Sequence, residues 1–69
     1  MNPYFVIIDK ESEYYGQIVT LIVRSTVGTG LAVYTVKTAS LDTLTMLSYQ
    51  ITGGFLLRSY AENYAKKLM

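Results

Sequence analysis

The 69-residue chain contains no cysteine and no histidine, and it has only one proline. Without cysteine it forms no disulfide bonds and no thiolate zinc sites, and without histidine it lacks the most common general base and imidazole ligand. We therefore expect a non-enzymatic protein without metal or cofactor. The absence of cysteine is also consistent with a reducing compartment, so we expect a cytoplasmic location.

Charge is also sparse, with a net charge of +1 at pH 7, which gives no broad electrostatic attraction to nucleic acid or to a membrane surface. The longest uncharged stretch, residues 43–57, is interrupted by threonine, serine, glutamine and glycine. It is shorter than the ~20 apolar residues that a membrane span needs. The first residues lack the basic region of a secretory signal. We expect one small domain, residues 1–69, with no membrane span.

Apolar residues, in contrast, are abundant and make up 51% of the chain. A domain of this length buries only about 60% of the surface that its unfolded chain exposes. Small domains commonly compensate by oligomerising or by docking on a partner. The composition therefore predicts a protein partner, with a homo-oligomer as the simplest form.

Two apolar runs rich in β-branched and aromatic residues flank an acidic segment near the start of the chain. Residues 4–8 and 17–24 have the length and composition of strands, and Pro3 suits the start of the first. The second run is apolar on both faces, which predicts a central strand or one buried on both sides. Residues 9–17, with the sequence DKESEYYGQ, form a polar loop between them.

A glycine-containing turn over residues 25–30 leads into a third strand over residues 31–38. The second and third strands therefore form a hairpin. Residues 40–51 can be a helix, with Ser40 as its N-cap and Gly53 after its end, or a strand in which Leu47, Tyr49 and Ile51 alternate. The density of threonine favours the strand. In that case Gly53-Gly54 close a tight hairpin into residues 55–59.

The last residues show the spacing of an amphipathic helix. Its apolar stripe consists of Leu57, Tyr60, Ala61, Tyr64, Ala65 and Leu68. A helix of this length is marginal in water by itself, so the stripe must pack on its own sheet or on a neighbouring subunit. The alanines allow close approach of another backbone, and the tyrosines are suited to an interface.

These elements together predict a mainly β fold: a small SH3-like barrel or a strongly bent antiparallel sheet, with a C-terminal amphipathic helix. The alternative is an α+β domain of three strands and two helices. The pattern from residue 4 to residue 38, with Asp9, Ser12 and the Tyr14-Tyr15-Gly16-Gln17 element in its loop, resembles SH3-like small barrels of the KOW type. This resemblance implies nucleic-acid binding, but the near-neutral chain lacks the basic patch of many such barrels.

The polar residues offer little chemistry. Asp9, Glu11 and Glu13 alternate and could offer oxygen ligands to a hard cation, but a solvated loop that protects strand ends is favoured. The pairs Gly28/Gly30 and Gly53/Gly54 are not followed by the Gly-Lys-Ser/Thr of a phosphate-binding loop, so we interpret them as turns. The serines and threonines have no adjacent base that could activate them.

The aromatic residues remain as candidate binding groups. In the favoured interpretation, a non-catalytic interaction or assembly subunit contacts a protein partner or a second copy of itself. Its predicted partner-binding residues are Tyr14, Tyr15, Tyr60, Tyr64 and Leu68, with at least one tyrosine of the loop exposed. The alternative is a small nucleic-acid-binding barrel. That protein would use tyrosine stacking and scattered basic residues, namely Tyr14, Tyr15, Arg24, Tyr34, Lys37 and Arg58.

Overall fold

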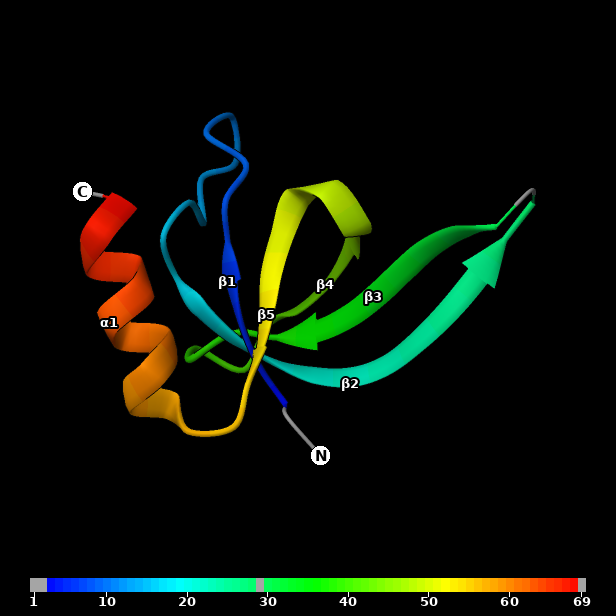
Figure 1. Cartoon of the computed structure of the whole chain (residues 1–69). Coiled ribbons are helices and arrows are strands. Elements are labelled where there is room, and N and C mark those ends of the chain that lie inside the picture. Colours follow the sequence, from blue (N-terminus) through cyan, green and yellow to red (C-terminus); the bar gives the residue numbers. More distant parts are fainter. Residues whose placement is uncertain (1–2, 29, 69) are drawn as a thin grey trace.

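The computed structural model describes residues 3–28 and 30–68, and within this part of the chain five strands precede one helix (Figure 1). The strands are β1 (Tyr4–Ile7), β2 (Ile18–Val27), β3 (Leu31–Lys37), β4 (Thr43–Leu47) and β5 (Ile51–Phe55). A short 3-10 turn, η1 (Ser48–Gln50), links β4 to β5, and the C-terminal helix is α1 (Arg58–Leu68). Strands make up 48% of the structure and helices 22%, which confirms the prediction of a mainly β domain with a C-terminal helix.

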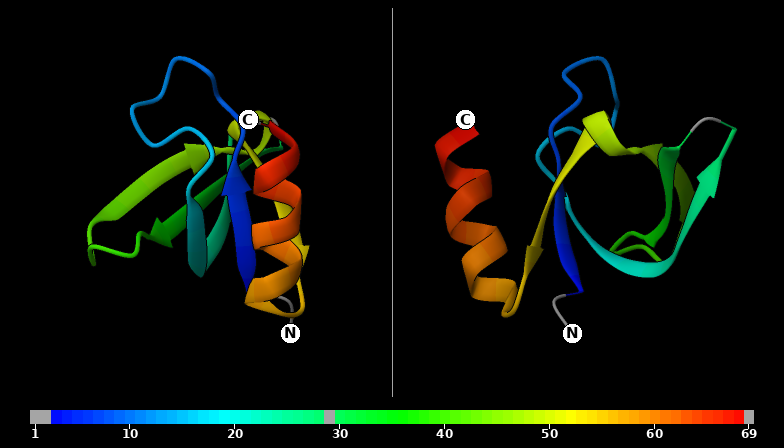
Figure 2. Two further views of the ribbon diagram at one scale, coloured as in Figure 1. Left: turned by 90° about the vertical axis from the view of Figure 1, so that its left-hand side faces the viewer. Right: turned by 45° about the vertical axis from the view of Figure 1, so that its right-hand side comes forward.

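All five strands belong to one antiparallel sheet in the order β4-β3-β2-β1-β5. Strands that are consecutive from β1 to β4 lie next to each other, and β5 returns to pair with the other side of β1. The sheet curls strongly, and α1 lies outside the curl against β1 and β5 (Figure 2). The predicted strongly bent antiparallel sheet is therefore present.

Buried apolar side chains form two groups, one on each face of the sheet. The group inside the curl consists of Ile7, Val19, Val36, Met46 and Ile51. The group between the sheet and α1 consists of Val6, Ala61 and Ala65. Successive residues of a strand point to opposite faces, so β1 contributes Val6 to one group and Ile7 to the other. Both side chains are fully buried, and β1 is therefore the strand that is covered on both sides.

β2 is the central strand of the sheet, as predicted, but the alternative that it is buried on both faces is wrong for most of its length. Val19 is fully buried, but Ile22 and Val23 are 53% and 50% exposed. The pairing of β2 with β3 shifts register between Leu21 and Val23, so that Ile22 is an extra residue without a direct partner. Such a bulge bends a strand and increases its twist. Beyond it, β2 runs away from the helix-covered part of the sheet (Figure 1).

The predicted hairpin of the second and third strands is confirmed. β2 and β3 pair from Thr20 opposite Lys37 to Val27 opposite Leu31. The turn is shorter than the predicted residues 25–30, because β2 continues to Val27 before the chain reverses. The β-branched residues at the end of β2 favour an extended backbone, and this explains the longer strand.

The helical alternative for residues 40–51 is wrong, since residues 43–47 form β4. A turn precedes this strand: the backbone N–H of Thr38 donates to the carbonyl oxygen of Asp42 at 2.9 Å, and the Thr38 Oγ1 accepts from the N–H of Asp42 at 3.1 Å. The extended segment does not continue through Tyr49, which lies in η1 and is 69% exposed. The alternation predicted for Leu47, Tyr49 and Ile51 is therefore interrupted.

The two glycines of β5 do not form the predicted hairpin turn. Gly53 lies in the middle of β5, opposite Phe5 of β1. A Cβ atom on Gly53 would lie 2.7 Å from both the Phe5 Cδ2 and the Tyr4 carbonyl oxygen, and the φ angle of Gly53 is +156°. Glycine is needed here because β5 passes close to β1. The predicted strand over residues 55–59 is wrong, because α1 begins at Arg58.

Candidate interaction surfaces

The acidic loop between β1 and β2 is held by its own hydrogen bonds. The N–H of Ser12 donates to the Asp9 carbonyl at 3.0 Å, and the N–H of Gly16 donates to the Ile7 carbonyl at 2.8 Å. The Asp9 carboxylate accepts from the N–H of Glu11 at 3.0 Å and from the Nε2 of Gln50 at 2.9 Å. Both oxygens of Asp9 thus have structural partners, one within the loop and one, Gln50, that ties the loop to η1.

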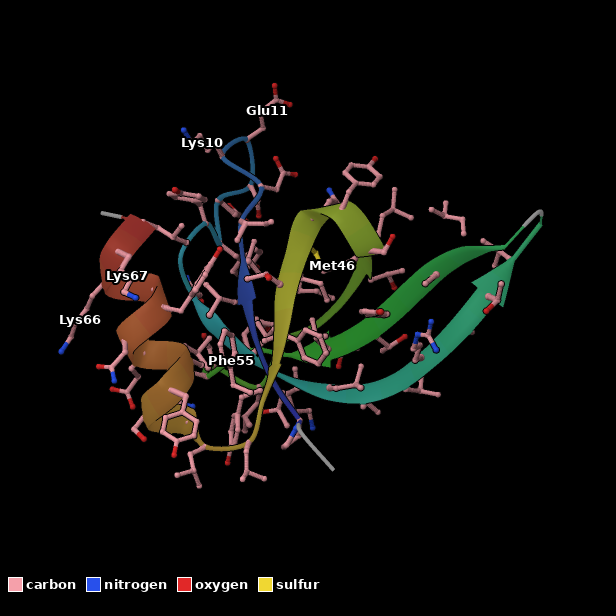
Figure 3. The ribbon with its side chains drawn as sticks, viewed as in Figure 1. Lys10, Glu11, Met46, Phe55, Lys66 and Lys67 are labelled. Carbon is pink, nitrogen blue, oxygen red and sulfur yellow. The ribbon has the colours of Figure 1, made fainter. Side chains whose placement is uncertain are left out.

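The remaining charges of this loop project into solvent. Lys10, Glu11 and Glu13 are exposed, and Figure 3 shows the first two at the tip of the loop. Among residues 3–28 and 30–68, no group of three or more carboxylate, histidine or cysteine side chains is placed to hold a metal ion. The alternation of Asp9, Glu11 and Glu13 does not gather their carboxylates in one place, because the loop forms successive turns rather than a strand.

The paired tyrosines of the loop are half-buried, so the prediction that at least one is exposed is wrong. Tyr14 packs against the buried group inside the curl. The hydroxyl of Tyr15 donates to the carbonyl oxygen of Leu68 at 3.4 Å. The two tyrosines, although adjacent in the chain, thus contact different parts of the domain.

Tyr14 also has an altered acidity. The carboxylate of Glu13 raises the pKa of Tyr14 above its usual value of 10.0, and partial burial and the carboxylate of Asp42 act in the same direction. Negative neighbours and desolvation both disfavour the phenolate. The Tyr14 hydroxyl therefore stays protonated and is not activated as a nucleophile or base.

The apolar stripe of α1 packs on the chain's own sheet. Ala61 and Ala65 are buried against Val6, and their small side chains let the helix approach β1 closely. Tyr64 lies against Phe55, with the ring centroids 5.7 Å apart. Figure 3 shows Phe55 on the side of β5 that faces the helix, whereas Lys66 and Lys67 lie on the outer side of α1.

Only one of the five predicted partner-binding residues is exposed. Tyr64 and Leu68 are partly buried in the group between sheet and helix, and Tyr14 and Tyr15 are half-buried in the loop. Tyr60 is 52% exposed. The structure does not bring the five together on one open surface, since most of them are used for packing within the domain.

Tyr60 has exposed apolar neighbours that the sequence interpretation did not include as a group. Leu56 and Leu57, between β5 and α1, are 56% and 47% exposed. Together with Tyr60 they form what we call the junction patch. Leu56 falls outside the helical spacing of the stripe, and its only signal in the sequence is an apolar pair directly before a helix.

A second apolar surface lies on the hairpin of β2 and β3 beyond the bulge, which we call the hairpin arm (residues 22–28 and 30–33). Ile22, Val23, Val27 and Leu31 are 53%, 50%, 51% and 41% exposed. The arm extends away from α1 and from the rest of the sheet (Figure 1). The sequence showed an apolar strand here, but nothing in it indicated that the bulge would leave this half uncovered.

The basic residues of the nucleic-acid alternative are dispersed. The Arg24 guanidinium lies over the Tyr34 ring, 5.8 Å from its centroid, on the face of the arm that leads into the curl. Lys37 lies three residues from Tyr34 on the same strand, so the two side chains project from opposite faces. Arg58 is on α1, where its Nε lies 3.9 Å from the Glu62 carboxylate. These three cations do not share a surface.

Comparison with protein-family models, with curated proteins and with solved structures finds no match to this chain. Over the described part of the chain, side chains enclose no pocket, and no helix is long and apolar enough to cross a membrane. The most prominent features of the described surface are therefore the two exposed apolar surfaces, the hairpin arm and the junction patch.

Proposed function

We propose that this protein is a non-catalytic interaction or assembly subunit, which self-associates or docks in a larger complex. The observation that carries the proposal is the exposure of nine large apolar side chains among the described residues, each between 41% and 73% exposed. Only eight apolar residues are buried there, and two of these are alanines. Isolated exposed apolar residues are ordinary, but grouped ones are typical of contact sites.

Grouping is what distinguishes the hairpin arm and the junction patch. Seven of the nine exposed residues belong to these two surfaces, and the other two are Leu41 and Tyr49. Burying such surface against another protein would be favourable by roughly 25 cal/mol per Å² of apolar area removed from water. The small domain cannot gain this stabilisation alone.

We further propose that the fold is a small SH3-like barrel of the KOW type in a cytoplasmic protein. The support is the series of strand, acidic loop with Tyr14-Tyr15-Gly16-Gln17, strand, glycine turn and strand, followed by two more strands in a strongly curled sheet. The lack of cysteine supports the compartment.

The competing proposal, a nucleic-acid-binding barrel, has one observation in its favour. Arg24 and Tyr34 lie together on the arm, where a base could stack and a phosphate could pair. The dispersal of Lys37 and Arg58 and the net charge of +1 weigh against it, because phosphate neutralisation supplies most non-specific affinity.

Two solution measurements test these proposals. Sedimentation velocity over a dilution series is expected to show reversible association of the chain, whereas a monomer at every concentration contradicts self-association. Fluorescence anisotropy with short single strands is expected to show no binding that weakens steeply with salt. Steeply salt-dependent binding would favour the nucleic-acid proposal.

A further inference from the structure

The outer half of β2 has one edge that no other strand of the described chain covers. β3 accompanies β2 along its length to Val27, but β1 pairs with the other side of β2 only as far as Tyr4 opposite Thr20. Within residues 3–28 and 30–68, the last backbone hydrogen bond on this side is the one that the N–H of Leu21 donates to the Pro3 carbonyl at 2.8 Å. Among the described residues, no strand pairs with this edge from Ile22 to Val27. Unpaired edges are templates for pairing with another chain.

This edge lacks the features that usually prevent such pairing. Its sequence, IVRSTV, has no proline and no lysine, and three of its side chains are apolar and at least half exposed. Its one charged residue, Arg24, lies over the ring of Tyr34 in the same chain. Prolines, lysines and short edges are the common protections of natural edge strands.

We infer that the edge of β2 pairs antiparallel with the same edge of a second copy of this chain. The pairing would join two sheets across a two-fold axis, with the same surface used by both copies. This inference rests on the proposed self-association and specifies its surface. The position of the arm, away from α1 and the acidic loop, leaves this edge accessible (Figure 1).

The alternation of side chains selects the register. Arg24 and Thr26 lie opposite Tyr34 and Ala32 on one face of the arm, so Val23, Ser25 and Val27 lie on the other. Directly opposite residues in an antiparallel pair share a face. A two-fold axis at Ser25 therefore places Val23 against Val27 of the second copy, and Arg24 against its Thr26.

Neighbouring registers are less favourable. An axis at Arg24 would place two guanidinium groups directly opposite each other, and like charges in such pairs are destabilising. An axis at Thr26 would leave Val23 beyond the paired segment and would bring Gly28 opposite Arg24. The register centred on Ser25 is the one that pairs valine with valine twice and keeps the charges apart.

The expected association is reversible. Five residues of each copy are paired, fewer than the roughly 20–30 residues that each partner contributes to a standard stable interface. Main-chain hydrogen bonds and two valine pairs supply the attraction, as in other complexes formed by strand addition. The dimer should therefore form with rising concentration rather than persist on dilution.

Single cysteines test the register directly, because the parent chain contains none. Opposite Cα atoms in an antiparallel pair lie about 4.5–5.5 Å apart, which a disulfide can span. Ser25→Cys is expected to form a covalent dimer under mild oxidation, detected by non-reducing electrophoresis. Thr45→Cys, at an exposed position in the middle of the edge strand β4, is the matched control and is expected to form no covalent dimer.

A mixing experiment checks the offset. In a dimer of Val23→Cys alone, the two cysteines lie four positions apart along the paired strands, about 13 Å. The same separation applies to Val27→Cys alone, and it is beyond the reach of a disulfide. A mixture of the two variants is expected to form covalent heterodimers. Rapid cross-linking of Val23→Cys alone would overturn the register.

Ser25→Lys completes the test, because it places two ammonium groups against each other across the axis. We expect it to weaken association at least tenfold, while Thr45→Lys associates like the parent; far-UV circular dichroism verifies that both are folded. If the parent associates but Ser25→Lys associates equally well, the edge assignment is wrong and self-association stands. If the parent is monomeric throughout and Ser25→Cys does not cross-link, both are wrong.

Discussion

At the scale of single residues, Gly53 determines how closely β5 approaches β1. A methyl group there would meet the Phe5 ring and the Tyr4 carbonyl at 2.7 Å. We expect Gly53→Ala to lower the free energy of unfolding by about 2–3 kcal/mol, because the strands must move apart. Urea denaturation followed by circular dichroism measures this change.

Gly28→Ala is the control for backbone strain alone. Gly28, at the hairpin tip, has a φ of +56°, and a methyl group on it would meet no atom within 4 Å beyond its chain neighbours. Its substitution should cost about 1 kcal/mol through the left-handed backbone conformation. Equal losses in the two variants would contradict a steric role for Gly53.

Tyr14 offers a second test at this scale, through its titration. Glu13 is the main cause of its raised pKa, so Glu13→Gln should bring that pKa closer to 10.0. The chain has seven tyrosines, so the titration should be followed by NMR with site-specific assignment. Glu11→Gln is the control, since Glu11 is exposed and does not contribute to the shift.

The same shift predicts a pH dependence of stability. The folded chain holds the Tyr14 proton more tightly than the unfolded chain, so this contribution to stability is fully present below pH 10.0 and is lost as pH rises through the folded pKa. The parent should therefore lose more stability at alkaline pH than Glu13→Gln does. An identical alkaline loss in both chains would contradict the assigned cause.

At the scale of elements, α1 is a packed part of the domain. Tyr64→Asp would place a carboxylate against Phe55 in the group between sheet and helix. Burying such a charge without a partner is unfavourable, and we expect a loss of about 2 kcal/mol in the free energy of unfolding, with reduced helicity.

Lys67→Asp is the control for this variant, because Lys67 is exposed on the outer side of α1. It changes charge without touching the packed face and should lower stability by no more than about 0.5 kcal/mol. If the two variants have the same stability, α1 does not depend on its contact with the sheet.

The elements that were predictable from the sequence are those with local patterns. Alternating β-branched residues indicated β1, β2 and β3, and the 3,4 spacing indicated α1. Two errors came from contacts between distant segments. We interpreted Gly53 as a turn residue, but its small size is what lets β5 lie close to Phe5. The bulge at Ile22 depends on pairing with β3, and no local sequence pattern indicates it.

At the scale of the whole molecule, the composition predicts a partner, which stays a prediction, and the spacing of apolar residues did not indicate which apolar side chains are exposed. The helix stripe was a reasonable candidate from its spacing, yet Ala61, Ala65 and Tyr64 are used within the domain. Tyr60 is exposed and remains a candidate. The hairpin arm was missed because its exposure results from the bending of β2, which is a property of the assembled sheet.

The central claim is that the small domain buries its exposed apolar surface by self-association. Static light scattering over a dilution series of the unmodified chain tests it most directly. The account predicts an apparent mass near 7.8 kDa in dilute solution that rises toward twice this value as concentration increases. A mass of 7.8 kDa at every concentration would contradict it.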